Sequence, residues 1–317
     1  HCLSLLFSAT IDPHQHLGMQ HILTADQFSR KDILSLFDAA RKLQNAKKLP
    51  QIMKGKILAT VFLEPSTRTR LSFETAMLKL GGQVISIPNA ETSSLNKGET
   101  LEDTGRMIST FADIIAIRTP EKDQVTQFAT HAEVPVINAG DGTGEHPTQH
   151  LLDLYTVWKT RRKLNGLTIG LMGDCRNSRV LRGMAKIVAQ FKVKVFFIAP
   201  PEVQVSDDIK NYLRKHHVPY SLSFRIEEVI DQLDVLQVNR IRHEYFVDKT
   251  KAHEIGKQFI LNKKMVQMGK PELIVLDPLP RINTVQTEVD DMPQAKYFEA
   301  VKNGVFVRMA LMRWLMK

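Results

Sequence analysis

The sequence predicts an α/β protein in which parallel sheets are flanked by helices. Two observations carry this prediction. Short apolar, β-branched runs recur along the chain, and amphipathic stretches with helical spacing separate them. Alternation of strand and helix is typical of a parallel sheet covered by helices. The length of 317 residues then indicates two such units, because one domain commonly holds about 150 residues.

Eight segments are predicted to be buried strands. Each is bounded by Gly, Pro, Asn or Asp, which are residues that commonly end strands. The segments are 57–63, 84–87, 113–117, 134–137, 167–172, 193–198, 235–238 and 273–276. Eight strands fit either one large sheet or two sheets of four.

The domain boundary is placed near residue 150, after a glycine-rich stretch at 138–144. A helix is expected at about 147–163 and would connect the two halves. Residues 1–150 would then form the first domain and residues 151–300 the second. The Met-rich end of the chain, at about 301–317, has the spacing of an amphipathic helix and is expected to pack back on the first domain.

The charge and the apolar runs limit the classes of partner. Lys and Arg outnumber Asp and Glu by 43 to 34, and a basic excess suits anionic metabolites or nucleic acid. A solvated basic surface explains the charge equally well. A basic patch interleaved with aromatic residues is missing from the sequence, so no nucleic-acid partner is expected. No apolar run approaches the roughly 18–20 residues of a membrane span, so no membrane role is expected.

The two cysteines, Cys2 and Cys175, cannot build a disulfide framework. A reducing compartment, the cytoplasm, is therefore expected, and the first residues lack the basic segment of a secretory signal. The two cysteines also lack metal-ligand spacing, and no metal site is expected. A dinucleotide fingerprint and a phosphate loop with Lys are both absent, and no cofactor is expected.

A dense cluster of hydroxyls and guanidiniums follows the first predicted strand. Residues 64–70 read Glu-Pro-Ser-Thr-Arg-Thr-Arg, and a helix is expected to begin there with Ser66 as its N-cap. The free N–H groups of a helix N-terminus bind anions, and an Arg adds a two-pronged donor for phosphate. The cluster therefore predicts an anion site, although a capped helix with two surface arginines would show the same residues.

Polar residues also follow other predicted strands of the first half. Ligands of parallel sheets bind beyond the carboxyl ends of the strands, so Arg118, His146 and Gln149 are expected near the same site. A neutral His can donate a hydrogen bond to a carbonyl oxygen, and Gln can accept one from an amide. Taken singly, each of these residues fits a surface or capping role as well.

The second half repeats this arrangement with arginines. Arg179, Arg240 and Arg242 follow predicted strands, and Arg281 closes the segment Asp-Pro-Leu-Pro-Arg after the last one. Arginines at strand ends in both halves predict two anionic sites that face each other across a cleft, one for phosphate and one for carboxylates. Lys97 lies on a polar loop, where a surface role is the simpler interpretation.

Together these motifs resemble the aspartate/ornithine carbamoyltransferase family. The segments 63–75 and 146–149 occur in the family's order and spacing, and the resemblance covers nearly the whole chain. Residues 96–100 (Asn-Lys-Gly-Glu-Thr) and 278–281 (Pro-Leu-Pro-Arg) are similar to the aspartate branch. The ornithine branch has a Cys-Leu-Pro motif at the second of these positions.

The resemblance implies a reaction and a set of site residues. The carbamoyl group of carbamoyl phosphate would pass to the amine of L-aspartate, giving N-carbamoyl-L-aspartate and phosphate for pyrimidine biosynthesis. The catalytic residues would be Arg68, Thr69, Arg118 and His146. Carbamoyl phosphate would be bound by Ser66, Thr67, Arg68, Thr69, Arg118, His146, Gln149, Pro278, Leu279 and Pro280. Aspartate would be bound by Lys97, Arg179, Arg240 and Arg242.

The resemblance also implies a homotrimer with shared active sites, in which Ser94 and Lys97 come from a neighbouring subunit. It leaves open whether regulatory subunits or other pathway enzymes attach. Three positions depart from the aspartate branch: Asp277 and Thr119 stand where His is usual, and Arg242 stands where Gln is usual. Arg242 motivates one alternative, a different amino-acid acceptor. A catalytically weak homologue that serves as a binding subunit is the other.

Overall fold

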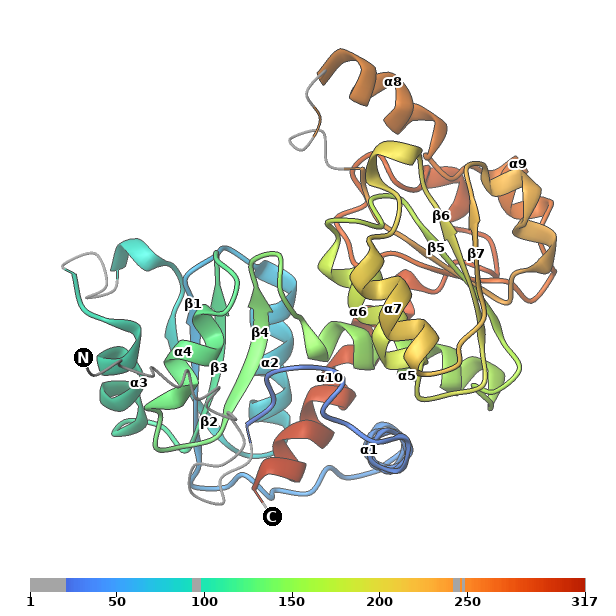
Figure 1. The fold of residues 1–317 in the computed structure, drawn as a ribbon. Coiled ribbons are helices and arrows are strands. Elements are labelled where there is room, and N and C mark those ends of the chain that lie inside the picture. Colours follow the sequence, from blue (N-terminus) through green and yellow to red (C-terminus); the bar gives the residue numbers. More distant parts are fainter. Residues whose placement is uncertain (1–20, 93–97, 242–245, 247–248, 317) are drawn as a thin grey trace, which may run out of the picture.

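The computed structural model describes residues 21–92, 98–241, 246 and 249–316. Strands and helices alternate along the described chain and form two parallel sheets that lie apart from each other (Figure 1). The predicted α/β class is confirmed.

The first sheet has four strands in the order β2-β1-β3-β4. These are β1 (Ile57–Phe62), β2 (Gln83–Ile87), β3 (Ile114–Thr119) and β4 (Val136–Asp141). Its helices are α1 (Arg30–Gln44), α2 (Thr67–Lys79), α3 (Leu101–Ser109) and α4 (Gln124–Thr130). The central strands β1 and β3 are almost wholly buried, as expected for parallel strands covered on both faces.

The second sheet has five strands in the order β7-β6-β5-β8-β9. These are β5 (Thr168–Met172), β6 (Lys194–Ile198), β7 (Tyr220–Ser223), β8 (Val235–Val238) and β9 (Ile274–Leu276). Its helices are α6 (Arg179–Val188), α7 (Asp207–Lys215), α8 (Lys249–Gln258) and α9 (Lys263–Gln267).

The prediction of eight strands missed β7, so neither one large sheet nor two sheets of four describes the fold. Strand β7 has the sequence Tyr-Ser-Leu-Ser, and Ser223 is its one buried residue. It lies at the edge of the second sheet, where solvent covers one side and an apolar run is not needed. The sequence signal for a buried strand is therefore lacking there.

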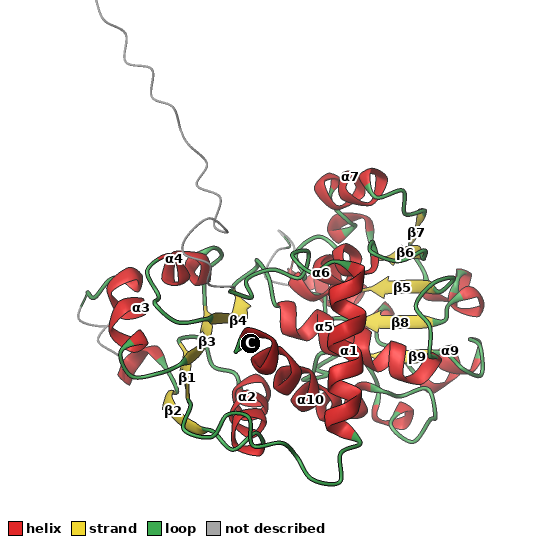
Figure 2. Cartoon of the chain, turned by 90° about the horizontal axis from the view of Figure 1, so that it is seen from below, coloured by secondary structure: helices red, strands yellow, loops and turns green. Residues whose placement is uncertain are grey.

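Two long helices join the halves of the molecule. Helix α5 (Pro147–Arg161) leads from the first sheet to the second, and α10 (Tyr297–Leu315) packs against α1, α2 and α5 between the sheets (Figure 2). The aromatic rings of Phe37 and Tyr155 meet edge to face at 5.4 Å in this region. One apolar cluster therefore continues from the first sheet to the second, and each fully buried large apolar side chain contributes about 1.5–3 kcal/mol.

The Met-rich C-terminal stretch forms part of the core, as its spacing predicted. Met309 and Met312 on α10 are fully buried. Across the described ranges, no helix combines the length and the apolar character that a membrane span requires.

Candidate active site

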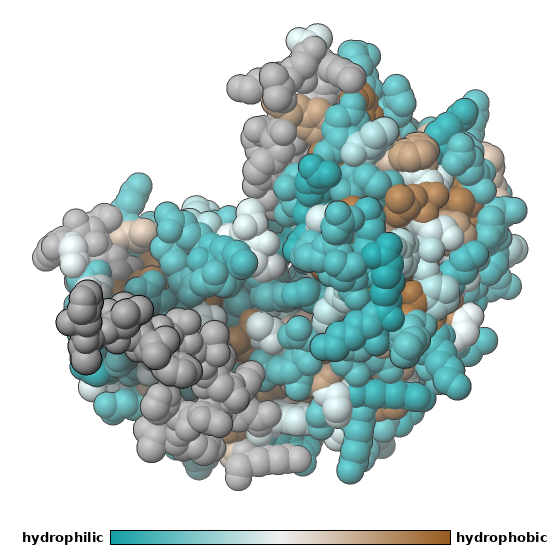
Figure 3. All heavy atoms as spheres, in the orientation of Figure 1, coloured by the Kyte–Doolittle hydropathy of each residue, from teal (hydrophilic) through white to brown (hydrophobic). Residues whose placement is uncertain are grey.

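The carboxyl ends of strands from both sheets border one cavity of about 450 Å³. The molecule is hollowed between its two lobes, with hydrophilic residues on both sides (Figure 3). The sequence-predicted residues that line the cavity are Ser66, Thr67, Arg68, Thr69, Arg118, His146, Gln149, Arg179, Arg240, Pro278, Leu279 and Pro280. Three predicted residues, Ser94, Lys97 and Arg242, lie outside the described residues.

The N-terminus of α2 forms one wall of the cavity. The helix begins at Thr67, and Ser66 precedes it in an extended conformation. Ser66 occupies the expected N-cap position, but its side chain makes no capping hydrogen bond. The first-turn N–H groups have no partner within a helix, so this wall offers backbone donors and hydroxyls to an anion.

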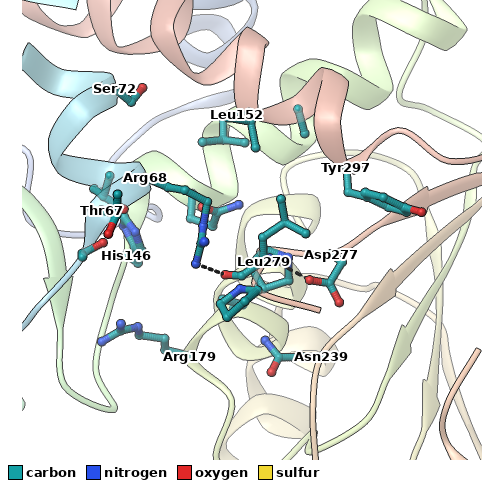
Figure 4. A pocket seen from close by; sticks show the side chains of 18 of the residues that line it. Thr67, Arg68, Ser72, His146, Leu152, Arg179, Asn239, Asp277, Leu279 and Tyr297 are labelled. Carbon is teal, nitrogen blue, oxygen red and sulfur yellow. Dashed lines mark hydrogen bonds between the residues drawn. The ribbon is translucent and has the colours of Figure 1, made fainter. Parts of the chain in front are cut away.

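Arg68 reaches across the cavity to the second half of the chain (Figure 4). Its Nη2 atom donates a hydrogen bond to the Leu279 carbonyl oxygen at 2.7 Å. The Leu279 N–H donates to Asp277 Oδ1, also at 2.7 Å. Burial raises the pKa of Asp277. Asp277 is one of the three departures from the family pattern. Its side chain supports the loop by accepting this hydrogen bond from the backbone N–H of Leu279.

Glu64 joins two of the predicted arginines. Its Oε2 atom lies 2.8 Å from Arg118 Nη2 and 3.6 Å from Arg179 Nη2. Burial lowers the pKa of Arg118, and the charge of Glu64 opposes this change. Gly140 leaves room for the guanidinium, because a Cβ there would lie 2.9 Å from Arg118 Nη1. The sequence motif contained Glu64, but its contact with both halves was not predicted.

His146 is a buried side chain at the start of α5. It is 4% exposed, and burial lowers its pKa well below the ordinary value, with a further contribution from the charges of Arg179 and Arg118. Its Nδ1 atom has no hydrogen-bond partner among the described residues. Buried polar atoms in proteins are almost always hydrogen-bonded, so this wall is built to meet a polar ligand.

The second wall carries Arg179 and Arg240. Ser178 caps α6 by accepting a hydrogen bond from the Leu181 N–H at 3.2 Å, which places Arg179 on the first residue of the helix. Arg179 also donates to the Gly142 carbonyl oxygen. Arg240 follows β8 and lines the same cavity, so two arginines of the second half border the cavity that the α2 motif also lines.

Arg308 is a cavity residue that the sequence reasoning missed. It lies on α10 and is 3% exposed, and it donates to Ser72 Oγ at 3.0 Å and to Thr148 Oγ1 at 3.1 Å. Burial lowers its pKa to about 9, against the charge of Asp153. Its signal in the sequence was a single cation inside an otherwise apolar stretch of helix.

The remaining departure that the structure describes, Thr119, lies outside the cavity lining. It is fully buried, and its hydroxyl donates to the Glu121 carbonyl oxygen at 3.2 Å. No cluster of three or more His, Cys, Asp or Glu residues in the described chain has an arrangement that could hold a metal ion.

Two family models match nearly the whole chain. The carbamoyl-P binding domain of aspartate/ornithine carbamoyltransferase matches residues 20–159, and the Asp/Orn binding domain matches residues 165–315. The chloroplastic aspartate carbamoyltransferase of Arabidopsis thaliana is 42% identical over 304 residues, which are 94% of this chain and 78% of that relative.

Solved structures give the same result. The catalytic subunit of aspartate transcarbamoylase from M. jannaschii is 38% identical with a TM-score of 0.88, over 94% of this chain and 98% of that one. Aspartate transcarbamoylase from Trypanosoma cruzi, in complex with N-(phosphonacetyl)-L-aspartic acid, is 33% identical with a TM-score of 0.86, over 92% of this chain and 94% of that one. The chain therefore belongs to the aspartate/ornithine carbamoyltransferase family.

Proposed function

We propose that the protein transfers the carbamoyl group of carbamoyl phosphate to the amine of L-aspartate, giving N-carbamoyl-L-aspartate and phosphate for pyrimidine biosynthesis. The observation that carries this proposal is the single cavity that the 66–69 motif and the arginines Arg179 and Arg240 line together. A phosphate group and a dicarboxylic amino acid require cationic donors on opposite sides of one site. The relatives described above, which are named as aspartate carbamoyltransferases, support the same reaction.

The first half of the site binds the donor. Ser66, Thr67, Arg68 and Thr69 hold the phosphate at the N-terminus of α2, where hydroxyls, N–H groups and a guanidinium converge. Gln149 and the backbone of the 278–279 segment hold the carbamoyl NH₂ group. The contact between Arg68 and the Leu279 carbonyl supports this assignment, because it brings both groups to one part of the cavity.

Thr69, Arg118 and His146 polarise the carbonyl oxygen of the donor. Negative charge develops on that oxygen when the amine attacks, and fixed donors at this point stabilise the transition state more than the ground state. The lowered pKa of His146 supports a neutral ring, and a neutral ring can still donate one hydrogen bond. Loss of one such donor typically costs ~10²–10³ in rate.

Arg179 and Arg240 bind the aspartate carboxylates, with Arg242 and Lys97 as further contributors. The neutral amine of aspartate attacks the carbonyl carbon, the C–O bond to phosphate breaks, and the departing phosphate takes the amine proton. No protein nucleophile takes part in this scheme. The contribution of the protein is orientation, which can supply ~7–11 kcal/mol when two reactants are held in place.

The assay compares acceptors. Purified protein is given carbamoyl phosphate with aspartate or with ornithine, and ureido product is measured. Product with aspartate and not with ornithine is the expected result. Absence of product with both substrates would contradict the proposal and would favour a catalytically weak binding subunit.

A different amino-acid acceptor is the second candidate. The observation that favours it is Arg242, because a guanidinium cannot accept a hydrogen bond from the substrate amine as the usual Gln can. A panel of amino acids tested with carbamoyl phosphate distinguishes the candidates. Faster product formation with another amino acid than with aspartate would replace the first proposal by the second.

We propose further that the protein works as a homotrimer in which Ser94 and Lys97 complete a neighbouring site. Large apolar side chains on the outer face of the first domain support an interface there: Leu71 and Leu78 on α2 are 50% and 60% exposed, and Ile85 on the edge strand β2 is 41% exposed. Sedimentation equilibrium tests the subunit number, and a monomeric active enzyme would contradict it.

Sharing of the sites needs its own test. The variants Lys97→Ala and Arg68→Ala are each expected to be nearly inactive. If they are dissociated together and reassembled, mixed trimers contain sites with an intact Arg68 and an intact Lys97 from its neighbour, and turnover returns. No recovery in reassembled mixtures would contradict shared sites.

The cytoplasmic location stays a prediction from the cysteine content. The thiol of Cys175 is buried, and burial raises its pKa, which agrees with an inert structural residue. Fractionation of the source cells with an antibody against the protein tests the location, and a signal from an organelle fraction would contradict it.

A further inference from the structure

The side-chain amide of Gln149 is fixed at one end by Asp153. The two residues lie four positions apart on α5, so their side chains lie on the same face of the helix. Gln149 Nε2 donates a hydrogen bond to Asp153 Oδ2 at 3.0 Å. Gln149 lines the cavity, whereas Asp153 is fully buried and does not line it. The nitrogen end of the amide is therefore occupied, and the oxygen end is left for a ligand.

Asp153 is an unusual residue at such a depth. Burial of a carboxylate is costly unless it is paired, and Asp153 Oδ1 has no hydrogen-bond partner among the described residues. Burial raises the pKa of Asp153 to about 7, and the charge of Asp277 adds to this rise, whereas the hydrogen bond from Gln149 and the charge of Arg308 act against it. The one hydrogen-bond partner that the structure gives this carboxylate is therefore an amide of the cavity wall.

Arg308 supplies the countercharge from α10. It is buried, and its hydrogen bonds to Ser72 and Thr148 tie α10 to α2 and α5, the two helices whose first turns line the cavity. Its charge favours the ionised form of Asp153. In the structure, Asp153 accepts the hydrogen bond from Gln149 Nε2. This contact holds Gln149 in the orientation in which its nitrogen faces Asp153.

We propose that Asp153 is a positioning residue that orients the Gln149 amide, so that its oxygen accepts a hydrogen bond from the NH₂ group of the carbamoyl donor. This inference rests on the proposed function and deepens it, because it assigns the selection of the donor to a buried carboxylate. An acetyl group presents a methyl group where a carbamoyl group presents N–H donors. A fixed acceptor at this wall therefore favours carbamoyl phosphate over acetyl phosphate.

Asp153→Asn tests the proposal with a side chain of the same shape. The amide of Asn can donate to the Gln149 oxygen. Gln149 is then expected to turn its nitrogen toward the cavity, where it cannot accept a hydrogen bond from the carbamoyl NH₂ group. The kcat/KM for carbamoyl phosphate is expected to fall about tenfold, which corresponds to one hydrogen bond. The inhibition constant of acetyl phosphate, measured against carbamoyl phosphate, is expected to stay unchanged.

A change for carbamoyl phosphate without a change for acetyl phosphate distinguishes positioning of Gln149 from support of the fold. If Asp153 had a purely structural role, the variant would bind both compounds more weakly. That result would overturn the proposal, and so would an unchanged kcat/KM. Thr156→Val is the matched control on α5. It removes the buried hydrogen bond that Asn303 of α10 donates to Thr156, away from the cavity lining. It should not change kcat/KM for carbamoyl phosphate relative to the inhibition constant of acetyl phosphate. A wild-type protein without turnover would contradict the proposed function instead.

If the single variant does not fold because Arg308 is left without a countercharge, Arg308→Met and the double variant Asp153→Asn/Arg308→Met replace it. Both of these variants lack Arg308, so any effect of its loss on anion binding is the same in the two proteins and cancels in the comparison. The ratio between the KM for carbamoyl phosphate and the inhibition constant of acetyl phosphate should rise about tenfold in the double variant relative to Arg308→Met. An equal ratio in both proteins would overturn the proposal.

Discussion

The two sides of the cavity are built in different ways. On the side of the first sheet, four consecutive residues at one helix N-terminus line the cavity, together with Arg118 and the first turn of α5. On the side of the second sheet, Arg179, Arg240 and the 278–280 segment lie in the stretches of chain that follow three different strands, β5, β8 and β9. The first side consists of one local sequence motif and a few neighbouring residues. The second side consists of single residues, distant in the sequence, that the tertiary fold brings together.

This difference suggests a division of labour. A helix N-terminus with fixed N–H groups is suited to hold an anion before the other reactant arrives. Separate arginines on a second lobe are suited to bind a second anion and to bring it close. Variants on the first side are therefore expected to affect both substrates, and variants on the second side mainly the acceptor.

The largest effect is expected at Arg68. In Arg68→Ala the site loses the guanidinium that reaches from the α2 motif to Leu279, and turnover should fall by ~10²–10³ or more. Steady-state ureido formation measures the loss. Arg70→Ala is the matched control, because Arg70 pairs with Glu74 and does not line the cavity. Equal losses of turnover in the two variants would mean that Arg68 contributes no more to the site than Arg70, an arginine outside the cavity lining.

A smaller and more selective effect is expected at Arg179. Arg179→Met removes one charged donor from the acceptor side, and loss of such a hydrogen bond typically costs about 1.5–3 kcal/mol. The KM for aspartate should therefore rise about 10–100-fold, with a much smaller change for carbamoyl phosphate. Arg182→Met is the control on the same helix, where Arg182 pairs with Asp208 at 2.6 Å. A larger effect on carbamoyl phosphate than on aspartate would break the comparison.

The joint between the two sides can be tested at Gly183 of α6. A Cβ at this position would lie 2.0 Å from His150 Nε2 on α5. Gly183→Ala should therefore lower the free energy of unfolding by about 1–3 kcal/mol, as is usual for an overpacked core. Urea unfolding measures the change. In a His150→Ala background, Gly183→Ala should lower the free energy of unfolding by a smaller amount. An equal decrease in both backgrounds would mean that the added methyl group does not clash with His150.

The smallest effect is a pH dependence from His150. Burial lowers its pKa to about 3, with a further contribution from the charge of Lys186, so the folded state stays unprotonated where the unfolded state binds a proton. The free energy of unfolding should therefore fall as the pH drops below about 6.5. Between pH 7 and pH 5.5, the wild type should lose about 1 kcal/mol more than His150→Gln. Parallel losses in urea titrations would contradict a neutral buried ring.

The same contrast explains which parts of the site could be predicted from the sequence. The α2 motif was recognisable because hydroxyls, arginines and a helix start lie within five residues, and this local pattern is enough to define an anion site. The arginines of the second half were recognisable only as strand-end residues. Their approach to the first half depends on how α5 and α10 pack between the two sheets.

There is a physical reason why the sequence did not reveal the roles of three residues in and around the site: Arg308, Asp153 and Glu64. Arg308 and Asp153 lie in helix interiors, where a single charged residue in an amphipathic pattern looks like a surface position. Burial of both residues results from the packing of α10 across α2 and α5, which local spacing does not encode. The contact of Glu64 with Arg179 requires the closeness of the two lobes, which the motif alone does not contain.

The most direct test of the central claim is calorimetric titration with a single molecule that carries a phosphonate joined to aspartate. If the α2 motif and Arg179 face one site, this molecule fills both halves together. It should then bind at least ~10²-fold more tightly than inorganic phosphate, as is usual for analogues that span a transition state. Binding no tighter than that of phosphate alone would contradict a shared cavity for the two substrates.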